Sequence, residues 1–398
     1  MNNNLILIVL SAIVLISHFF NLIAKHFRIP TVLLLIGLGI GLKEGSRFLH
    51  VGIVNVSPFL GFLGIVGLIL IVLEGASDLE IKSKNFPTIR RSFHTALAIL
   101  LISAGVIAAL FHLWLKVDIE RALVNAIPFG VISSAVAIPT VADFIRHKRD
   151  FLIYESIFSD VLGILLFNLM VGPGLLSHGA VSNFFIQFGI IIITSVLGAF
   201  LLIAVLHNIK AQVKFFIILA LLVLIYALAG IFNLPSLLLV FVFGLFLKNI
   251  EAFPRMALLR HIPLQEIGTD VEQFKLIVAE SAFLVRTFFF VVFGYSIDMA
   301  YDFNAQVFLV GIPVMLILFW IRFLYLKLIV KPHVFPETFI APKGLVTVVL
   351  FASIPSSLHI GAIGKGEVLF VILASNLLIL FGFFSKPAPG PEITNPTA

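Results

Sequence analysis

Long apolar runs, each bounded by charged residues or proline, dominate the chain. Runs of about 20 residues are long enough for a helix to cross roughly 30 Å of hydrocarbon, and they predict about thirteen transmembrane helices. We place these spans near residues 5–24, 30–42, 58–74, 93–115, 121–143, 151–171, 182–207, 214–231, 235–248, 276–296, 306–327, 338–358 and 366–385. The runs at 30–42 and 235–248 are short for a bilayer and hold corresponding places in the two halves, which indicates a duplication.

Composition supports this membrane interpretation. Hydrophobic residues make up 61% of the 398 positions, charged residues only 12%, and the mean hydropathy is +1.18, which excludes a water-soluble core. We expect residues 1–385 to form one polytopic transmembrane domain and the proline-rich segment 386–398 to be a short disordered cytoplasmic tail. The chain has no cysteine, so disulfides and thiolate metal sites are excluded.

The basic residues predict an orientation rather than a nucleic-acid surface, although the net charge is +6. With the N-terminus outside, the predicted cytoplasmic and external loops hold Lys and Arg in a ratio of roughly 18 to 5, as the positive-inside rule requires. We therefore expect a multi-pass protein of the cell inner membrane with its C-terminus in the cytoplasm. The long loop at 251–272 has the pattern of an amphipathic helix on the cytoplasmic surface.

Asp160 is the strongest candidate for chemistry, because it falls in the middle of the span 151–171. An ionisable group at that depth is expensive and indicates a functional site. The alternative is a protonated carboxylic acid that is hydrogen-bonded to a neighbouring helix. Glu155 lies on the same predicted helix, displaced by roughly 140° around its axis, so the two carboxylates face different neighbours.

The span 121–143 contains a proline, Pro139, together with the hydroxyls of Ser133, Ser134 and Thr140. Proline removes a backbone donor and tends to break a helix, and freed carbonyls at membrane depth are tolerated where they line a site. Hard cations such as Na⁺ or K⁺ bind such oxygen atoms. The alternative is an ordinary kink whose hydroxyls bond their own helix.

A second interruption, Pro342-Lys343-Gly344, falls in the span 338–358. It lies seven helices after the first, and an odd offset predicts an inverted repeat in which two broken helices cross at the midplane. Lys343 would then neutralise the negative ends of the half-helices, or else it would extend to the cytoplasmic face.

Other ionisable side chains in the spans are candidates for structural charge pairs. Arg286 cannot lose its proton at any relevant pH and needs a carboxylate partner in lipid, for which Glu155 is the first candidate and Glu280 or Asp160 the alternatives. Arg322 and Glu74 are placed near an interface, where Arg322 can extend to water.

Four segments, in order, resemble motifs of the monovalent cation:proton antiporter superfamily. IVLEGASDLEI, with Glu74, is similar to its FEGGLxLD pattern, and SSAVAIP to its unwound helix in the SSTA form of the potassium-efflux branch. ESIFSD, with Ser159 and Asp160, is similar to ESxxND, which carries the ion-binding aspartate. PKGLVTVVLFASIP is similar to LRGAVSLALALSLP, with Lys343 in place of arginine. The acidic residue of the family's TDP form is absent, and serine precedes Asp160.

The resemblance implies an all-α Na⁺/H⁺ antiporter-like fold, a homodimer embedded in membrane lipid and alternating access. A carboxylate desolvated at mid-membrane has a raised affinity for protons, so a monovalent cation, Na⁺ or K⁺, competes with H⁺ at Asp160. Ser159, Ser133, Ser134 and Thr140 are its expected helpers. We expect no cofactor, no nucleic-acid partner and no enzyme activity. The alternatives are a gated potassium-efflux pathway, a sodium-coupled organic-anion symporter and an intramembrane enzyme, although the spans show no metal triad or nucleophile with a base.

Overall fold

The computed structural model describes residues 3–27, 29–50, 56–171, 214–231, 236–249, 264–330 and 334–384, with a few positions between 186 and 198. The tail at 386–398, most of the expected span 182–207 and the first part of the loop at 251–272 lie outside the described residues. Within them the secondary structure is helical throughout and includes no strand. The helices are α1 (Asn3–Phe27), α2 (Thr31–Phe48), α3 (Ser57–Asp78), α4 (Phe86–Leu115), α5 (Ile119–Gly130), α6 (Ser134–Thr140), α7 (Arg146–Val171), α9 (Lys214–Ile231), α10 (Ser236–Lys248), α11 (Leu264–Ser296), α12 (Met299–Asp302), α13 (Ala305–Tyr325), α14 (Leu345–Ala352) and α15 (Lys365–Phe384), with short turns at Ser83–Asn85, Leu326–Val330 and Glu337–Phe339.

The observed helices follow the apolar runs closely. Among the described residues, eight segments are long and apolar enough to cross a membrane, and α9 and α10 are shorter apolar helices. The clearest differences are at the polar ends, because α4 and α11 extend beyond the apolar runs that predicted them. Hydropathy stops at the first charged residues, whereas backbone hydrogen bonding continues through them.

The two halves of the chain pack reciprocally, with helices of the first half in contact with helices of the second. The seven-span offset pairs α2 with α10, α3 with α11, α4 with α13 and α7 with α15. In the structure α2 packs along α11, while α10 packs along α3, so each helix contacts the counterpart of its neighbour. Helix α4 contacts its own counterpart α13. This reciprocal pattern is the arrangement expected of an inverted repeat.

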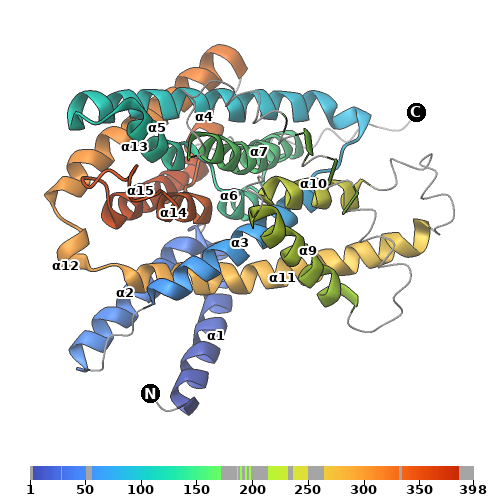
Figure 1. Ribbon diagram of the computed structural model, residues 1–398, viewed down its shortest axis with the longest axis horizontal. Coiled ribbons are helices and arrows are strands. Elements are labelled where there is room, and N and C mark those ends of the chain that lie inside the picture. Colours follow the sequence, from blue (N-terminus) through green and yellow to red (C-terminus); the bar gives the residue numbers. More distant parts are fainter. Residues whose placement is uncertain are drawn as a thin grey trace.

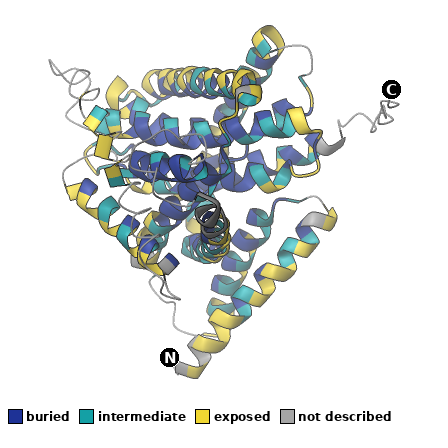
Figure 2. Cartoon of the chain, turned by 90° about the vertical axis from the view of Figure 1, so that its right-hand side faces the viewer, coloured by how far each residue is buried: buried dark blue, intermediate teal, exposed yellow. Residues whose placement is uncertain are grey.

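Two short helices, α6 and α14, lie in the interior of the bundle. Figure 1 shows them between α4 and α7 on one side and α3 and α11 on the other. Figure 2 shows buried residues concentrated in this region, whereas α1 is largely exposed. Because the lipid-facing side chains are also apolar, this buried zone differs from the surface by its polar side chains rather than by hydrophobicity.

The first interrupted span breaks at a different place from the one expected. We expected Pro139 to break the helix, but Pro139 lies inside α6, and the break comes earlier, at 131–133. The backbone is extended at Val131 (φ −70°, ψ 136°) and at Ser133 (φ −78°, ψ 115°). The polar groups that face this stretch provide the physical reason, because they bind backbone groups that a continuous helix would have paired internally.

Candidate functional site

The first break exposes three successive backbone N–H groups, and each finds a different partner. Ile132 donates to Ser159 Oγ at 2.8 Å, and Ser134 donates to Asp160 Oδ2 at 2.9 Å. Between them, Ser133 donates to the carbonyl oxygen of Pro342 at 2.8 Å. The break is therefore held by the Ser159–Asp160 pair of α7 and by the second interrupted segment.

The second break meets the first at close range. Gly344 precedes α14 in an extended conformation, and a Cβ atom added to it would lie 2.5 Å from Ser133 Oγ. Only glycine permits that approach, so Gly344 allows the two broken segments to cross as the odd offset predicts. The crossing joins residues more than 200 positions apart in the sequence.

Lys343 is buried at this crossing, with 2% of its surface exposed. Its ammonium donates to the carbonyl oxygens of Val131 at 2.8 Å and Gly130 at 3.3 Å. These carbonyls belong to the C-terminal end of α5, where a helix carries partial negative charge. The lysine therefore lies against a half-helix end instead of extending to the cytoplasmic face.

Asp160 is also buried, with 2% of its surface exposed. Its Oδ2 accepts the N–H of Ser134, but Oδ1 has no hydrogen-bond partner among the described residues. The hydroxyl of Ser133 at the same crossing is likewise buried without a partner there. No basic side chain that the structure describes forms an ion pair with Asp160. Asp160 Oδ1 and Ser133 Oγ are thus both available to coordinate a cation, and Asp160 Oδ1 can instead take up a proton.

Thr140 is not brought to this group. It lies at the far end of α6 from Ser134, about 9 Å along the helix axis, and its hydroxyl donates to the carbonyl of Val136 at 2.6 Å. This is the ordinary bond of a threonine to its own helix, and it corrects our expectation that Thr140 assists Asp160.

Arg286 pairs with a different carboxylate from the one expected. Its guanidinium donates to Glu74 Oε2 at 3.1 Å and to the carbonyl oxygen of Ala135 at 2.8 Å. Pro139 has no N–H to bond the carbonyl four residues before it, which is that of Ala135. Arg286 therefore caps the acceptor that Pro139 leaves open, and it links α11 to α3 and α6.

Glu155, the expected partner of Arg286, instead pairs with Arg322. The guanidinium of Arg322 contacts both carboxylate oxygens, at 2.6 and 2.9 Å, and its Nε donates to the carbonyl of Glu337 at 2.9 Å. Both residues are 1% exposed. We expected Arg322 to extend toward water, and this is wrong, because Glu155 and the Glu337 carbonyl satisfy the charge inside the protein. Glu280 is exposed on α11 and pairs with neither arginine.

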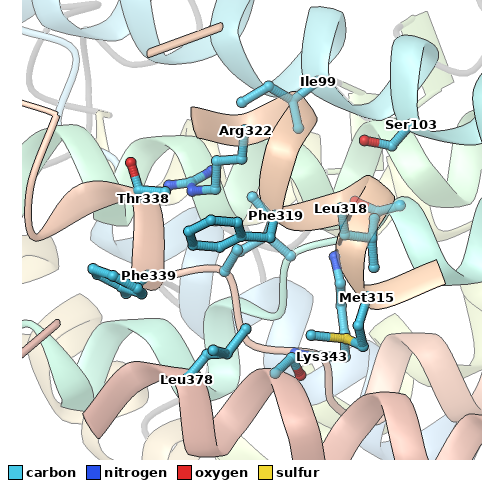
Figure 3. A pocket seen from close by; sticks show the side chains of 14 residues that line it. Ile99, Ser103, Met315, Leu318, Phe319, Arg322, Thr338, Phe339, Lys343 and Leu378 are labelled. Atoms are coloured by element: carbon cyan, nitrogen blue, oxygen red, sulfur yellow. Dashed lines mark hydrogen bonds between the residues drawn. The ribbon is translucent and has the colours of Figure 1, made fainter. Parts of the chain in front are cut away.

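A small cavity lies between Arg322 and the crossing. Its volume is about 30 Å³, and Figure 3 shows Arg322, Phe319 and Met315 of α13 and Lys343 among the side chains that line it. A cavity of this size has room for about two water molecules. A larger one of about 420 Å³ opens beside α6 and α7, lined by polar side chains that include Asp78, Glu80, Asp150 and Tyr154.

Two residues of α15 belong to this site although the sequence analysis did not single them out. Ser375 Oγ accepts the N–H of Lys343 at 3.0 Å, and the amide of Asn376 donates to the carbonyl of Lys343 at 2.9 Å. Both are buried. The signal was present in the sequence, since Ser375-Asn376 is an adjacent polar pair within an apolar span, in the same relative position as Ser159-Asp160.

Comparison with known proteins finds one family match and similar solved structures. A family described as "Sodium/hydrogen exchanger, transmembrane" matches residues 8–388. The structure is similar to that of the sodium proton antiporter MjNhaP1 from Methanocaldococcus jannaschii at pH 8, with a TM-score of 0.72 and 21% identity, covering 96% of this chain and 99% of that one. An electron-microscopy structure of MjNhaP1 aligns with a TM-score of 0.66 and 20% identity, covering 96% and 95%. No curated protein matches.

Proposed function

Because the chain belongs to the sodium/hydrogen exchanger family, we propose that it exchanges a monovalent cation, Na⁺ or alternatively K⁺, for protons by competition at Asp160. The observation that carries the proposal is the pair of free buried oxygens, Asp160 Oδ1 and Ser133 Oγ, at the crossing of two broken helices. A buried carboxylate has a high free energy when it is charged and alone, so it binds either H⁺ or a cation.

Competition alone is sufficient for exchange. If the protein changes its facing only when Asp160 carries a proton or a cation, each ion that leaves on one side must be replaced by the other. Ser159 fixes the extended backbone at Ile132, and Ser134 fixes the orientation of the carboxylate. The polar cavity beside α6 and α7 is a candidate approach for the ions, because its wall carries both carboxylates (Asp78, Glu80 and Asp150) and two arginines (Arg146 and Arg149).

The surrounding charges support a one-for-one exchange. Arg322 pairs with Glu155, Arg286 pairs with Glu74, and the carbonyls of Gly130 and Val131 accept hydrogen bonds from the ammonium of Lys343. Asp160 differs from these groups, because no basic side chain that the structure describes pairs with it, and we propose that it is the group that changes its protonation during a cycle. One proton leaves as one cation enters, and the exchange moves no net charge.

The working protein is proposed to be a homodimer in the inner membrane, with its N-terminus outside. The orientation rests on the distribution of Lys and Arg among the loops, and the dimer on the resemblance to the antiporter superfamily.

The test is cation-driven proton movement in proteoliposomes made with the purified protein. Addition of Na⁺, K⁺ or Li⁺ should collapse an imposed pH gradient for the parent. Asp160→Asn should abolish this response while the protein stays inserted and folded, because the amide keeps the volume and cannot titrate. Glu280→Gln, which removes an exposed carboxylate of α11, is the control and should exchange like the parent. More than a trace of exchange by Asp160→Asn would refute the proposal, and organic-anion uptake without proton flux would indicate the symporter instead.

A further inference from the structure

An adjacent pair of polar residues in α15 holds the peptide group of Lys343 from both sides. Ser375 Oγ accepts its N–H, and the amide of Asn376 donates to its carbonyl. Each side chain also donates to the carbonyl of Ile372, one turn earlier in α15, at 3.0 and 2.8 Å. The two side chains therefore have fixed orientations, and the backbone of Lys343 is held by a rigid helix.

At the first break, too, an adjacent pair of polar side chains binds the backbone of the broken segment. There Ser159 Oγ accepts the N–H of Ile132 and Asp160 Oδ2 accepts the N–H of Ser134. The two pairs, Ser159-Asp160 and Ser375-Asn376, lie on helices that are seven spans apart, as are the two breaks. Each pair thus follows its own broken segment in the same order, and Asn376 is the counterpart of Asp160 in the inverted repeat.

The backbone group that faces each side chain explains the difference between the two. Asp160 faces an N–H, which requires an acceptor, and a carboxylate provides one. Asn376 faces a carbonyl, which requires a donor, and an amide provides one. The first repeat therefore carries the titratable group, while the second carries a neutral amide whose NH2 group donates two hydrogen bonds and whose Oδ1 has no partner among the described residues.

The peptide of Lys343 in turn determines where its charge lies. With its backbone held by Ser375 and Asn376, the Lys343 ammonium reaches the carbonyls of Gly130 and Val131. Val131 is three residues before Ser134, whose N–H binds Asp160. We propose that Ser375 and Asn376 are positioning residues for exchange, which hold the positive charge of Lys343 at a fixed place beside the Asp160 site. This inference rests on the proposed exchange at Asp160.

The charge of Lys343 determines how the apparent KM for Na⁺ should change when its position is no longer fixed. A nearby ammonium weakens the binding of Na⁺ and H⁺ alike, because each brings one positive charge. When the ammonium is no longer held in place, both ions bind more tightly by a similar factor. In a competition, the apparent KM for Na⁺ then falls at alkaline pH and is unchanged at acidic pH. The pH at which the apparent KM begins to rise moves upward, by about half a pH unit or more.

The experiment measures the apparent KM for Na⁺ across a series of pH values in proteoliposomes, for the parent, Asn376→Ala and Asn125→Ala. Asn125 is the matched control, since it is equally buried and its amide also donates to its own helix, at Arg121, and to a distant carbonyl, at Leu358. Both variants should lose some thermal stability. Only Asn376→Ala should lower the alkaline KM and move the pH curve upward.

The inference is overturned if Asn376→Ala keeps the parental dependence of the apparent KM on pH. A loss of maximal rate or of stability equal to that of Asn125→Ala would then be its only effect. Should Asn376→Ala fail to fold, Ser375→Ala carries the test, with the same shifts expected at smaller size and the parental curve again refuting it. The proposed function fails separately, through exchange that persists in Asp160→Asn. Exchange that depends on Asp160 but not on Ser375 or Asn376 refutes the positioning role alone.

Discussion

The Glu155–Arg322 pair is expected to act as a brace of the fold, and Arg322→Ala tests this. The substitution removes two charge-assisted hydrogen bonds, at 2.6 and 2.9 Å, and leaves the Glu155 carboxylate, 1% exposed, without its partner. Removing one partner of a buried ion pair costs about 3 to 5 kcal/mol. The carbonyl of Glu337 also loses its donor, which adds about 1 kcal/mol. The expected loss is therefore roughly 4 to 6 kcal/mol.

The double variant Glu155→Met/Arg322→Met distinguishes a brace from two independent contacts. It removes both charges together and replaces them with apolar side chains, so it should recover most of the stability lost in Arg322→Ala. It should also exchange with the parental KM for Na⁺, because the two charges removed are opposite and adjacent, so their effects on Asp160 nearly cancel.

Unfolding of the purified protein in detergent can be followed by tryptophan fluorescence. The chain has two tryptophans, and Trp320 lies two residues from Arg322 on α13, where it reports directly on the braced helix. Lys248→Ala is the control, because its pair with Glu272 is at the surface, with side chains 24% and 60% exposed, and should cost about 1 kcal/mol or less. If Arg322→Ala unfolds like this control, or the double variant is no more stable than Arg322→Ala, the brace interpretation is refuted.

Three further outcomes are expected. Gly39→Ala should destabilise the protein by about 1 to 3 kcal/mol, because its Cβ would lie 2.1 Å from the Val291 carbonyl oxygen of α11. Gly41→Ala is the control and should be neutral or stabilising, because the space around it is open. Equal melting curves for the two variants would refute this. Partial burial works to raise the pKa of Asp298, but the hydrogen bond from Arg47 and the charge of Lys43 outweigh it and lower that pKa. The stability difference between the parent and Asp298→Asn should therefore be constant above about pH 4 and shrink below it, and a difference that already changes near neutral pH would contradict the assignment. On a solid-supported membrane, Na⁺ addition should give no sustained current, whereas a current whose sign follows the cation would show that a second group titrates.

The sequence by itself determined the class of protein, most helix positions and the candidate at the centre of the site. Each of these depends on a local quantity. The cost of placing a polar group in lipid can be estimated residue by residue, so the apolar runs predicted the spans, and Asp160 was identified because no neighbour in its span offsets its charge. The odd offset between the two interrupted spans was sufficient to predict that they cross.

Only the tertiary structure decided which groups meet. Arg286, Arg322, Glu74 and Glu155 allow several pairings, and the sequence contains no distances between helices, so our assignment of Glu155 to Arg286 was wrong. Likewise, Pro139 marks where a donor is missing, but the break forms where side chains of α7 satisfy the exposed N–H groups of Ile132 and Ser134. Those partners are more than 25 residues away along the chain, and for Pro342 and Ser133 more than 200. The balance between a continuous and a broken helix is set by such distant hydrogen bonds, and these exist only after the helices have packed.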